Sequence, residues 1–210
     1  MRRAISFALA VCVMAAISSR SISAQSSSAQ PNPANATGST PITITVDATD
    51  APRRMLHADL VIPVHPGDLT LVYAQWIPGE HGPTGPITNL AGIVIKANGQ
   101  TLPWVRDSIN MYALHVHVPA GVRSLQVHDD YLAAADPTGF SAGASTSENL
   151  AMVSWNELML WPQVASAKQV QVTPSVTLPP GWKYGTALTA TGHEGNTTHF
   201  ATVPLNQLID

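Results

Sequence analysis

The chain has 210 residues, in which 10 lysines and arginines stand against 13 aspartates and glutamates, and its formal net charge is −3. This acidic balance argues against nucleic acid or an anionic membrane as the partner. Cys12 is the only cysteine in the sequence, so an internal disulfide is excluded.

The first 24 residues predict a secretory signal peptide. Arg2 and Arg3 precede an apolar run of about 14 residues at positions 4–17, and Ser21-Ile22-Ser23-Ala24 then offers small residues for cleavage. The run is shorter than a comfortable membrane span, so cleavage near Ala24 is favoured over the alternative, an uncleaved N-terminal anchor. We therefore expect a secreted or periplasmic protein with no membrane span after cleavage.

Cleavage would leave seven basic residues against thirteen acidic ones, a net charge of about −6. Cys12 would leave with the signal peptide, so the exported domain must be stabilised by its core rather than by disulfides. Residues 25–40 are rich in Ser, Ala, Asn and Pro without apolar periodicity, which predicts a disordered, flexible linker. Residues 41–210 are long enough to form a single domain.

From residue 41 onward the apolar residues recur with a period of two. Ile42, Ile44 and Val46 alternate with threonines, which is typical of a half-buried strand. Further strands are predicted at residues 56–64, 69–76, 93–95, 112–118, 124–131, 170–178 and 199–203. Asn98-Gly99 predicts a tight hairpin turn, because both central residues of such a turn need positive φ. We expect residues 112–118 and 124–131 to pair with each other around Pro119-Ala120-Gly121.

Long helices are not expected in this chain. Its 17 prolines and 14 glycines are spaced between short apolar runs. Residues 147–161 fit either a short helix or an irregular strand. Many short strands separated by turn signals predict an all-β fold, an antiparallel β-sandwich-like domain at residues 41–210.

Gly139-Phe140-Ser141-Ala142-Gly143 matches the GxSxG pattern of hydrolase nucleophiles. That chemistry needs a buried strand before the serine, a helix after it, and an acid and a histidine further on. Asp136-Pro137-Thr138 precedes the pattern and is typical of a turn. A glycine- and serine-rich loop is therefore the preferred interpretation.

Two histidine pairs suggest metal sites at first sight. His193 and His199 are six residues apart, whereas a zincin helix needs its two histidines four apart, so a hairpin is the better interpretation. His115 and His117 share one face of a predicted strand, a geometry that metal sites use, but a third ligand is missing nearby. His128 would approach them only through the expected hairpin. A polar outer face is the preferred interpretation.

A loop punctuated by glycine and proline follows the strand predicted at residues 69–76. Its polar pair Glu80 and His81 is our candidate for a substrate-facing surface, because loops held between rigid strands commonly bind ligands. A structural turn with exposed polar tips is the alternative.

The same region carries a resemblance to a known family. Trp76-Ile77-Pro78-Gly79 resembles the Trp-x-Pro-Gly turn in the N-terminal domain of metallopeptidase family 61, the glycyl aminopeptidases. Five further segments resemble that domain in the same order, at residues 98–104, 127–132, 158–162, 180–183 and 205–210. Residues 80–86 depart from the family pattern.

The resemblance implies a three-part enzyme made of this β-domain, a thermolysin-like zinc domain with an HExxH motif, and often a PDZ domain. Zinc and the general base would belong to the second part, since this sequence contains no HExxH. We therefore expect no catalytic residue, no metal ligand and no cofactor in this chain, and we expect Asp210 to mark a domain boundary.

The predicted function follows from this resemblance. We expect a non-catalytic N-terminal domain of an exported zinc aminopeptidase, which supports the catalytic domain and the cleft for its peptide substrate. Apolar candidates for the interface with that domain are Trp76, Trp161, Leu205, Leu208 and Ile209. The alternatives are a free-standing secreted module that binds carbohydrate or peptide through residues 76–86, and a small metalloenzyme built on His115 and His117.

Overall fold

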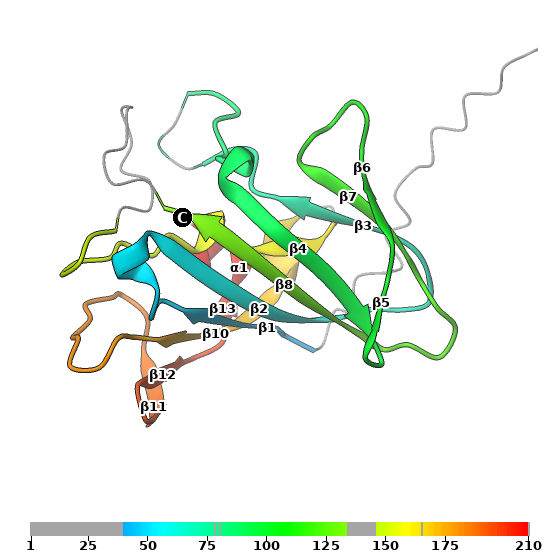
Figure 1. The fold of residues 1–210 in the computed structure, drawn as a ribbon. Helices are drawn as coiled ribbons and strands as arrows, with labels where there is room; N and C mark the ends of the chain where they lie inside the picture. The colour runs from blue at the N-terminus through cyan, green and yellow to red at the C-terminus, as the bar shows by residue number, and fades with distance from the viewer. Residues whose placement is uncertain (1–39, 78, 80, 134–145, 165, 210) are drawn as a thin grey trace, which may run out of the picture. The chain divides into compact units, whose positions relative to one another are not determined.

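The computed structural model describes residues 40–209 except residues 78, 80, 134–145 and 165, and β-strands are the main secondary structure of the described part (Figure 1). The predicted signal peptide, the linker up to residue 39 and the GxSxG pattern at residues 139–143 lie outside the described residues. None of the helices in the described part is long and apolar enough to cross a bilayer.

The described strands form two sheets. In spatial order the large sheet contains β11 (Ala190–Glu194), β12 (Thr197–Phe200), β10 (Gln171–Thr177), β1 (Ile42–Asp47), β2 (Met55–Pro63), β8 (Ser124–Leu132), β4 (Leu90–Ala97) and β5 (Gln100–Thr101), with β13 (Val203–Pro204) also paired to β10. The small sheet contains β6 (Trp104–Arg106), β7 (Ala113–Val118), β3 (Gly67–Tyr73) and β9 (Leu160–Pro162).

Short helical turns connect several strands. Four are 3-10 helices, at Ala51–Arg53, Ile87–Asn89, Trp155–Glu157 and Ala167–Gln169 in the described chain, and α1 covers Leu205–Leu208. Among the described strand pairs, β1 and β10 run parallel and the others run antiparallel. The all-β, sandwich-like fold predicted from the period-two pattern is therefore confirmed.

The two sheets share one hydrophobic core, which explains the alternation in the sequence. In β2 the side chains of Leu56, Ala58, Leu60 and Ile62 are buried, while the residues between them are at least partly exposed. The buried cluster combines residues of both sheets, and its large, fully buried members are Tyr131, Ile44, Leu56, Leu60, Ile62, Leu71, Ile95, Leu114, Leu125, Leu158, Met159 and Leu160. A strand with one buried face repeats with period two.

The predicted hairpin at Asn98-Gly99 is confirmed. Both residues have positive φ, 49° and 78°, and they join β4 to β5 with Ala97 opposite Gln100. Asn98 and Gly99 are residue types that tolerate this backbone conformation, which is why the turn is visible in the sequence.

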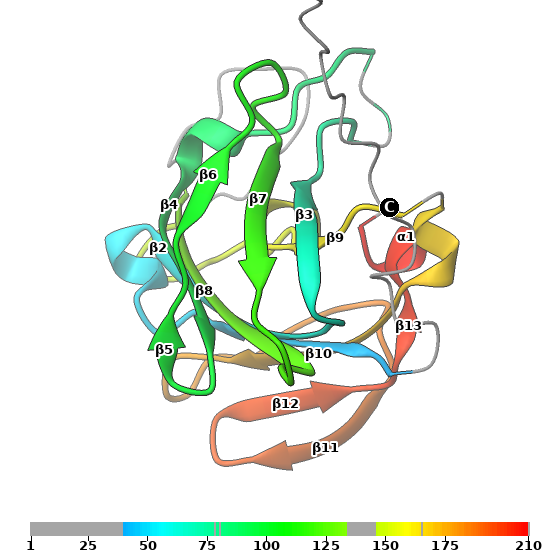
Figure 2. The same cartoon turned by 90° about the vertical axis from the view of Figure 1, so that its right-hand side faces the viewer.

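The expected pairing of residues 112–118 with 124–131 is wrong. β7 belongs to the small sheet and pairs with β3 and β6, whereas β8 belongs to the large sheet between β2 and β4 (Figure 2). Each of the two strands buries one face. Because the chain crosses from one sheet to the other between them, the buried face of β7 and the buried face of β8 both line the shared core. Turn residues show that the chain reverses, but they do not show which sheet receives the next strand.

Residues 147–161 contain both of the expected alternatives, each only a few residues long. Thr146 and Ala151 form an isolated bridge, Trp155–Glu157 is a 3-10 turn, and β9 begins at Leu160. This segment therefore adds the last strand of the small sheet and carries a buried polar group, Glu157, into the core.

Candidate functional site

The loop that follows β3 is fixed at its base by Tyr112. The Tyr112 hydroxyl lies 3.0 Å from the carbonyl oxygen of Pro83 and 3.2 Å from that of Gly85, and the Gly85 amide donates to the Gln75 carbonyl at 3.0 Å. The ring of Tyr112 also stacks on Tyr73, with centroids 6.5 Å apart. The base of the loop is therefore held by the ends of two strands.

Gly85 is required for this close packing. A Cβ atom at position 85 would lie 1.8 Å from the backbone oxygen of Ala74. Two backbone segments thus touch where the loop closes, and a side chain at this position would force them apart. Glycine is suited to such close approaches because it has no Cβ.

The connection between β6 and β7 lies at the same end of the small sheet as this loop, since Ala113 at the start of β7 pairs with Val72 near the end of β3 (Figure 2). The Asp107 carboxylate accepts hydrogen bonds from the amides of Asn110 and Ile109 at 2.7 and 2.8 Å. These bonds, together with one to His115, lower the pKa of Asp107 to about 2. The carboxylate therefore stays ionised and holds the turn.

Apolar side chains are exposed at this end of the small sheet. Trp76 is 62% exposed in the loop after β3, and Ile109 is 97% exposed and Met111 45% exposed in the β6–β7 turn. Tyr112 follows the β6–β7 turn, and its hydroxyl contacts the loop after β3. We call Trp76, Ile109 and Met111 the apolar end. Exposed aromatic and aliphatic side chains on an ordered surface are typical of protein interfaces.

The residues predicted from the sequence to face the substrate or the partner domain lie in different parts of the structure. Glu80 lies outside the described residues, and His81 is exposed in the loop after β3. Trp161, Leu205 and Leu208 are buried in the core of this domain, and Ile209 packs against it. Their apolar character is thus explained without a partner, and Trp76 offers the largest exposed surface of the five. The interface role of these five residues stays a prediction.

The histidines of β7 do not gather around a common point. His115 Nε2 lies 2.9 Å from Asp107, and His117 Nδ1 lies 2.7 Å from Asp68 on the neighbouring strand. The hairpin through which His128 could have approached them does not form, because β8 belongs to the other sheet. The exposed face of β7 is polar, as preferred from the sequence.

The hairpin interpretation of His193 and His199 is confirmed. β11 and β12 pair around Gly195, whose φ is 59°. His193 Nδ1 lies 3.0 Å from the Thr198 hydroxyl, and His199 Nδ1 lies 2.9 Å from the Ser175 hydroxyl. The two imidazoles thus make separate local contacts.

A buried polar cluster was missed by the sequence analysis. The side chains of Asp129 and Glu157 are buried between the sheets beside Tyr73 and Tyr131. The Tyr73 hydroxyl donates to the Glu157 backbone carbonyl at 3.1 Å, while neither carboxyl oxygen of Asp129 has a hydrogen-bond partner in the described structure. The alternation Leu125, Val127, Asp129, Tyr131 could have revealed an acid at a core position.

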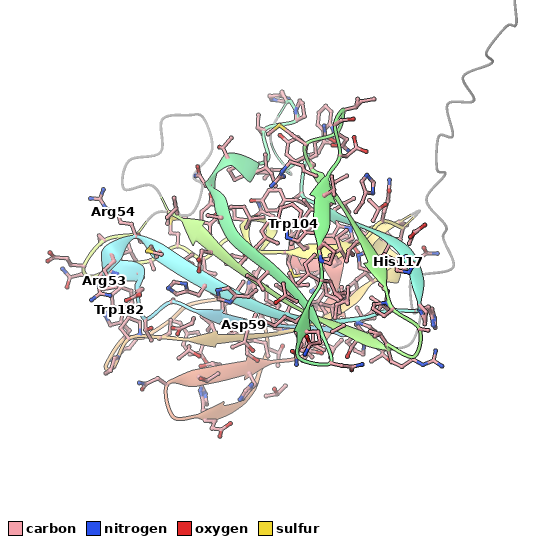
Figure 3. The ribbon with its side chains drawn as sticks, turned by 45° about the vertical axis from the view of Figure 1, so that its right-hand side comes forward. Arg53, Arg54, Asp59, Trp104, His117 and Trp182 are labelled. Carbon is pink, nitrogen blue, oxygen red and sulfur yellow. The ribbon has the colours of Figure 1, made fainter. Side chains whose placement is uncertain are left out.

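A pocket of about 800 Å³ opens beside the C-terminal strands. Four aromatic residues line it, and among them Phe200 packs edge-on against both Trp155 and Tyr184, with centroids 6.5 and 5.9 Å apart. Trp182, labelled in Figure 3, also lines the pocket. Its volume falls in the range of small-molecule sites. The described residues that line it do not include residues 76–86, through which the alternative of a binding module was expected to act.

These observations define an all-β, sandwich-like domain whose ordered loops present apolar groups at one end. The family model described as the peptidase M61 N-terminal domain matches residues 43–210. The chain therefore belongs to the peptidase M61 N-terminal domain family, and the resemblance found in the sequence is confirmed.

Solved structures similar to this chain include parts of two larger proteins. An aminopeptidase N family protein from Idiomarina loihiensis has a TM-score of 0.64 and 16% identity, over 80% of this chain and 28% of that chain. An M1 zinc metallopeptidase from Deinococcus radiodurans has a TM-score of 0.42 and 16% identity, over 77% of this chain and 37% of that one. The chain thus spans well under half of either protein. The curated proteins gave no match.

The close approach of Gly85 to Ala74 predicts that substitution by alanine destabilises the protein more at position 85 than at position 82. Gly85→Ala should open the loop and lower the free energy of unfolding by about 1–3 kcal/mol, because the new methyl group overlaps backbone. Gly82→Ala is the matched control, since its Cβ would meet nothing closer than 3.7 Å. Urea unfolding compares the two, and equal effects would contradict the close packing.

The buried carboxyl group of Asp129 predicts a pH-dependent stability. Burial, with the charges of Asp130 and Asp59, raises its pKa well above 3.8, so folding retains a proton that the unfolded chain loses. The stability that this proton contributes is complete below pH 3.8 and is lost as pH rises toward the folded pKa.

Asp129→Asn removes this dependence. We expect the variant to be more stable than the parent by about 1–3 kcal/mol at neutral pH, with a smaller difference near pH 4. Thermal unfolding at a series of pH values measures the difference, and Asp68→Asn, at a side chain that is 96% exposed, controls for the lost charge. A difference that does not change with pH would contradict the account.

Proposed function

We propose that this chain is the non-catalytic N-terminal domain of an exported zinc metallopeptidase of the aminopeptidase type. Its role is to brace the catalytic domain and to form one wall of the substrate cleft. The observation that carries the proposal is the family match, which extends over residues 43–210 and names an N-terminal peptidase domain. The fold shared with the larger protein from Idiomarina loihiensis supports it.

The apolar end supplies a docking surface for the catalytic domain. Trp76, Ile109 and Met111 are exposed although the loops that carry them are held by Tyr112 and Asp107. A surface ordered before binding loses little conformational entropy when a partner covers it. A catalytic domain that docks here would remove the exposed apolar surface of Trp76 and Ile109 from water.

The loop after β3 would border the substrate cleft. Tyr112 fixes its base, and His81 lies exposed on it, so the loop combines a rigid origin with a polar surface. Glu80, outside the described residues, is the second candidate for contact with a peptide substrate. Backbone carbonyls and polar side chains on fixed loops suit the binding of extended peptides.

Catalytic zinc would belong to the second domain. The sequence contains no HExxH motif, and His115 and His117 bind separate aspartates rather than facing one point. His115 and His117 therefore do not fit the catalytic metal of a thermolysin-like reaction, and no step of hydrolysis is assigned to this chain. A PDZ domain is a further expected partner.

We also propose that the protein is exported. The signal peptide predicted at residues 1–24, with cleavage near Ala24, would deliver the protein to the periplasm or the medium. The linker at residues 25–40 would then separate the cleavage site from the domain. A core without cysteine is compatible with an oxidising compartment because no thiol can be cross-linked.

Trp76 should dominate the association with the catalytic domain. In the protein expressed from its complete reading frame, Trp76→Ser should weaken domain docking by about 2 kcal/mol or more and lower aminopeptidase activity, because buried tryptophans are frequent hot spots. Leu150→Ser is the matched control, since Leu150 is 64% exposed but lies beside the aromatic pocket. Activity on an aminoacyl-p-nitroanilide and thermal unfolding are measured together. Equal effects of the two substitutions would contradict docking at the apolar end.

A further inference from the structure

The outer face of the large sheet carries a compact group of histidines and aspartates on β2 and β8. The ladder places His57 opposite Asp130 and Asp59 opposite His128, and all four side chains point away from the core. Figure 3 labels Asp59 on this face, whereas His117 lies on the small sheet. The group is therefore separate from both the apolar end and the histidines of β7.

Both imidazoles face the same carboxylate. His57 Nδ1 lies 2.6 Å from Asp130 Oδ1, and His128 Nε2 lies 3.4 Å from the same oxygen. One ligand atom from each of His57, His128 and Asp130 lies within 4.8 Å of the other two. Ligand atoms of a tetrahedral zinc site are about 3.4 Å apart, because Zn–N and Zn–O bonds are about 2.1 Å long. Of the two distances to Asp130 Oδ1, 3.4 Å matches that spacing and 2.6 Å is shorter than it.

The other nitrogen of each imidazole faces a second carboxylate. His128 Nδ1 lies 2.9 Å from Asp59, and His57 Nε2 lies 3.5 Å from Asp50. Each ring thus turns one nitrogen toward Asp130 and the other toward a carboxylate of its own. Metal-binding histidines commonly have this arrangement, in which an outer carboxylate fixes the ring and its tautomer.

The backbone of β4 makes room for Asp130. The pairing of β4 with β8 shifts register between Ala91 and Val94, and Gly92 in this bulge has a φ of 62°. A Cβ atom at Gly92 would lie 2.4 Å from Asp130 Oδ2. The bulge and its glycine therefore form a cradle that any larger residue would fill, and they hold the central carboxylate between the two histidines.

The charges of the group favour a cation. Three carboxylates face two imidazoles, and among the basic side chains of the neighbouring elements, Lys96 lies across β8 in β4 and Arg53 pairs with Asp50. Burial alone would lower the pKa of His57, but its hydrogen bonds to Asp130 and Asp50 and their charges raise it above 6.5. The same carboxylates attract a metal cation, and a proton on either ring would compete with it.

We propose that His57, His128 and Asp130 bind one divalent transition-metal ion of the Zn²⁺ type. Two imidazoles and one carboxylate suit Zn²⁺ better than Ca²⁺ or Mg²⁺, which prefer oxygen ligands. The three side chains are 24%, 40% and 26% exposed, so water completes the coordination. The ion joins β2 to β8 on the surface of the sheet and is distinct from the zinc of the catalytic domain.

Calorimetric titration with ZnCl₂ tests this site. The complete chain is prepared without a polyhistidine tag and stripped of metal by a chelator. We expect one equivalent to bind with a Kd of about 10 µM or lower, and thermal unfolding to shift upward in its presence. Absence of binding at about 100 µM Zn²⁺ would overturn the proposal.

Variants assign the ligands. His57→Gln and His128→Gln should each weaken binding at least about tenfold, and Asp59→Asn should weaken it by about tenfold as a support for His128. His117→Gln is the matched control, because His117 also lies beside an aspartate, at 2.7 Å, but on the small sheet. Circular dichroism confirms that each variant folds. Zinc binding that remains unchanged in the His57→Gln variant and in the His128→Gln variant would overturn the proposal. Loss of zinc binding in His117→Gln would place the metal elsewhere and would also overturn it.

Discussion

The antiparallel ladder between β2 and β8 is the constraint on which the rest of the structure depends. It runs from Met55 opposite Leu132 to Pro63 opposite Ser124 without a shift of register. A slip of one residue would move every side chain to the opposite face. The observed register sends Leu60 and Val127 into the core and leaves the histidines and aspartates outside. It also buries Asp129, so the same register that builds the core places a carboxyl group inside it.

The domain separates its surfaces by chemistry. The small sheet ends in loops with exposed apolar side chains, where we propose that a catalytic domain docks. The large sheet carries paired imidazoles and carboxylates on its outer face. The buried cluster of Tyr73, Tyr131 and Glu157 connects the two sheets between these surfaces. Docking and metal binding would therefore act on different faces of one core.

Local signals in the sequence predicted the strands of six residues or more, the Asn98-Gly99 turn and the all-β class, because alternation and turn chemistry depend on neighbouring residues. They did not predict strand partners, so the β7–β8 hairpin was wrong. His57 and Asp130 are 73 positions apart and meet only through the ladder, which no local pattern reveals. Trp161 and Leu205 show a related limit, because an apolar residue fits a core and an interface equally well until the fold is known.

Aminopeptidase activity reconstituted from separate parts tests the central claim most directly. The thermolysin-like zinc domain that we propose as the partner of this chain is assayed on an aminoacyl-p-nitroanilide while the purified chain is added in increasing amounts. The account predicts no hydrolysis by the chain alone, and a saturable rise in the activity of the zinc domain as the chain binds it. Hydrolysis by the chain alone, or activity of the zinc domain that the chain does not change, would contradict the account.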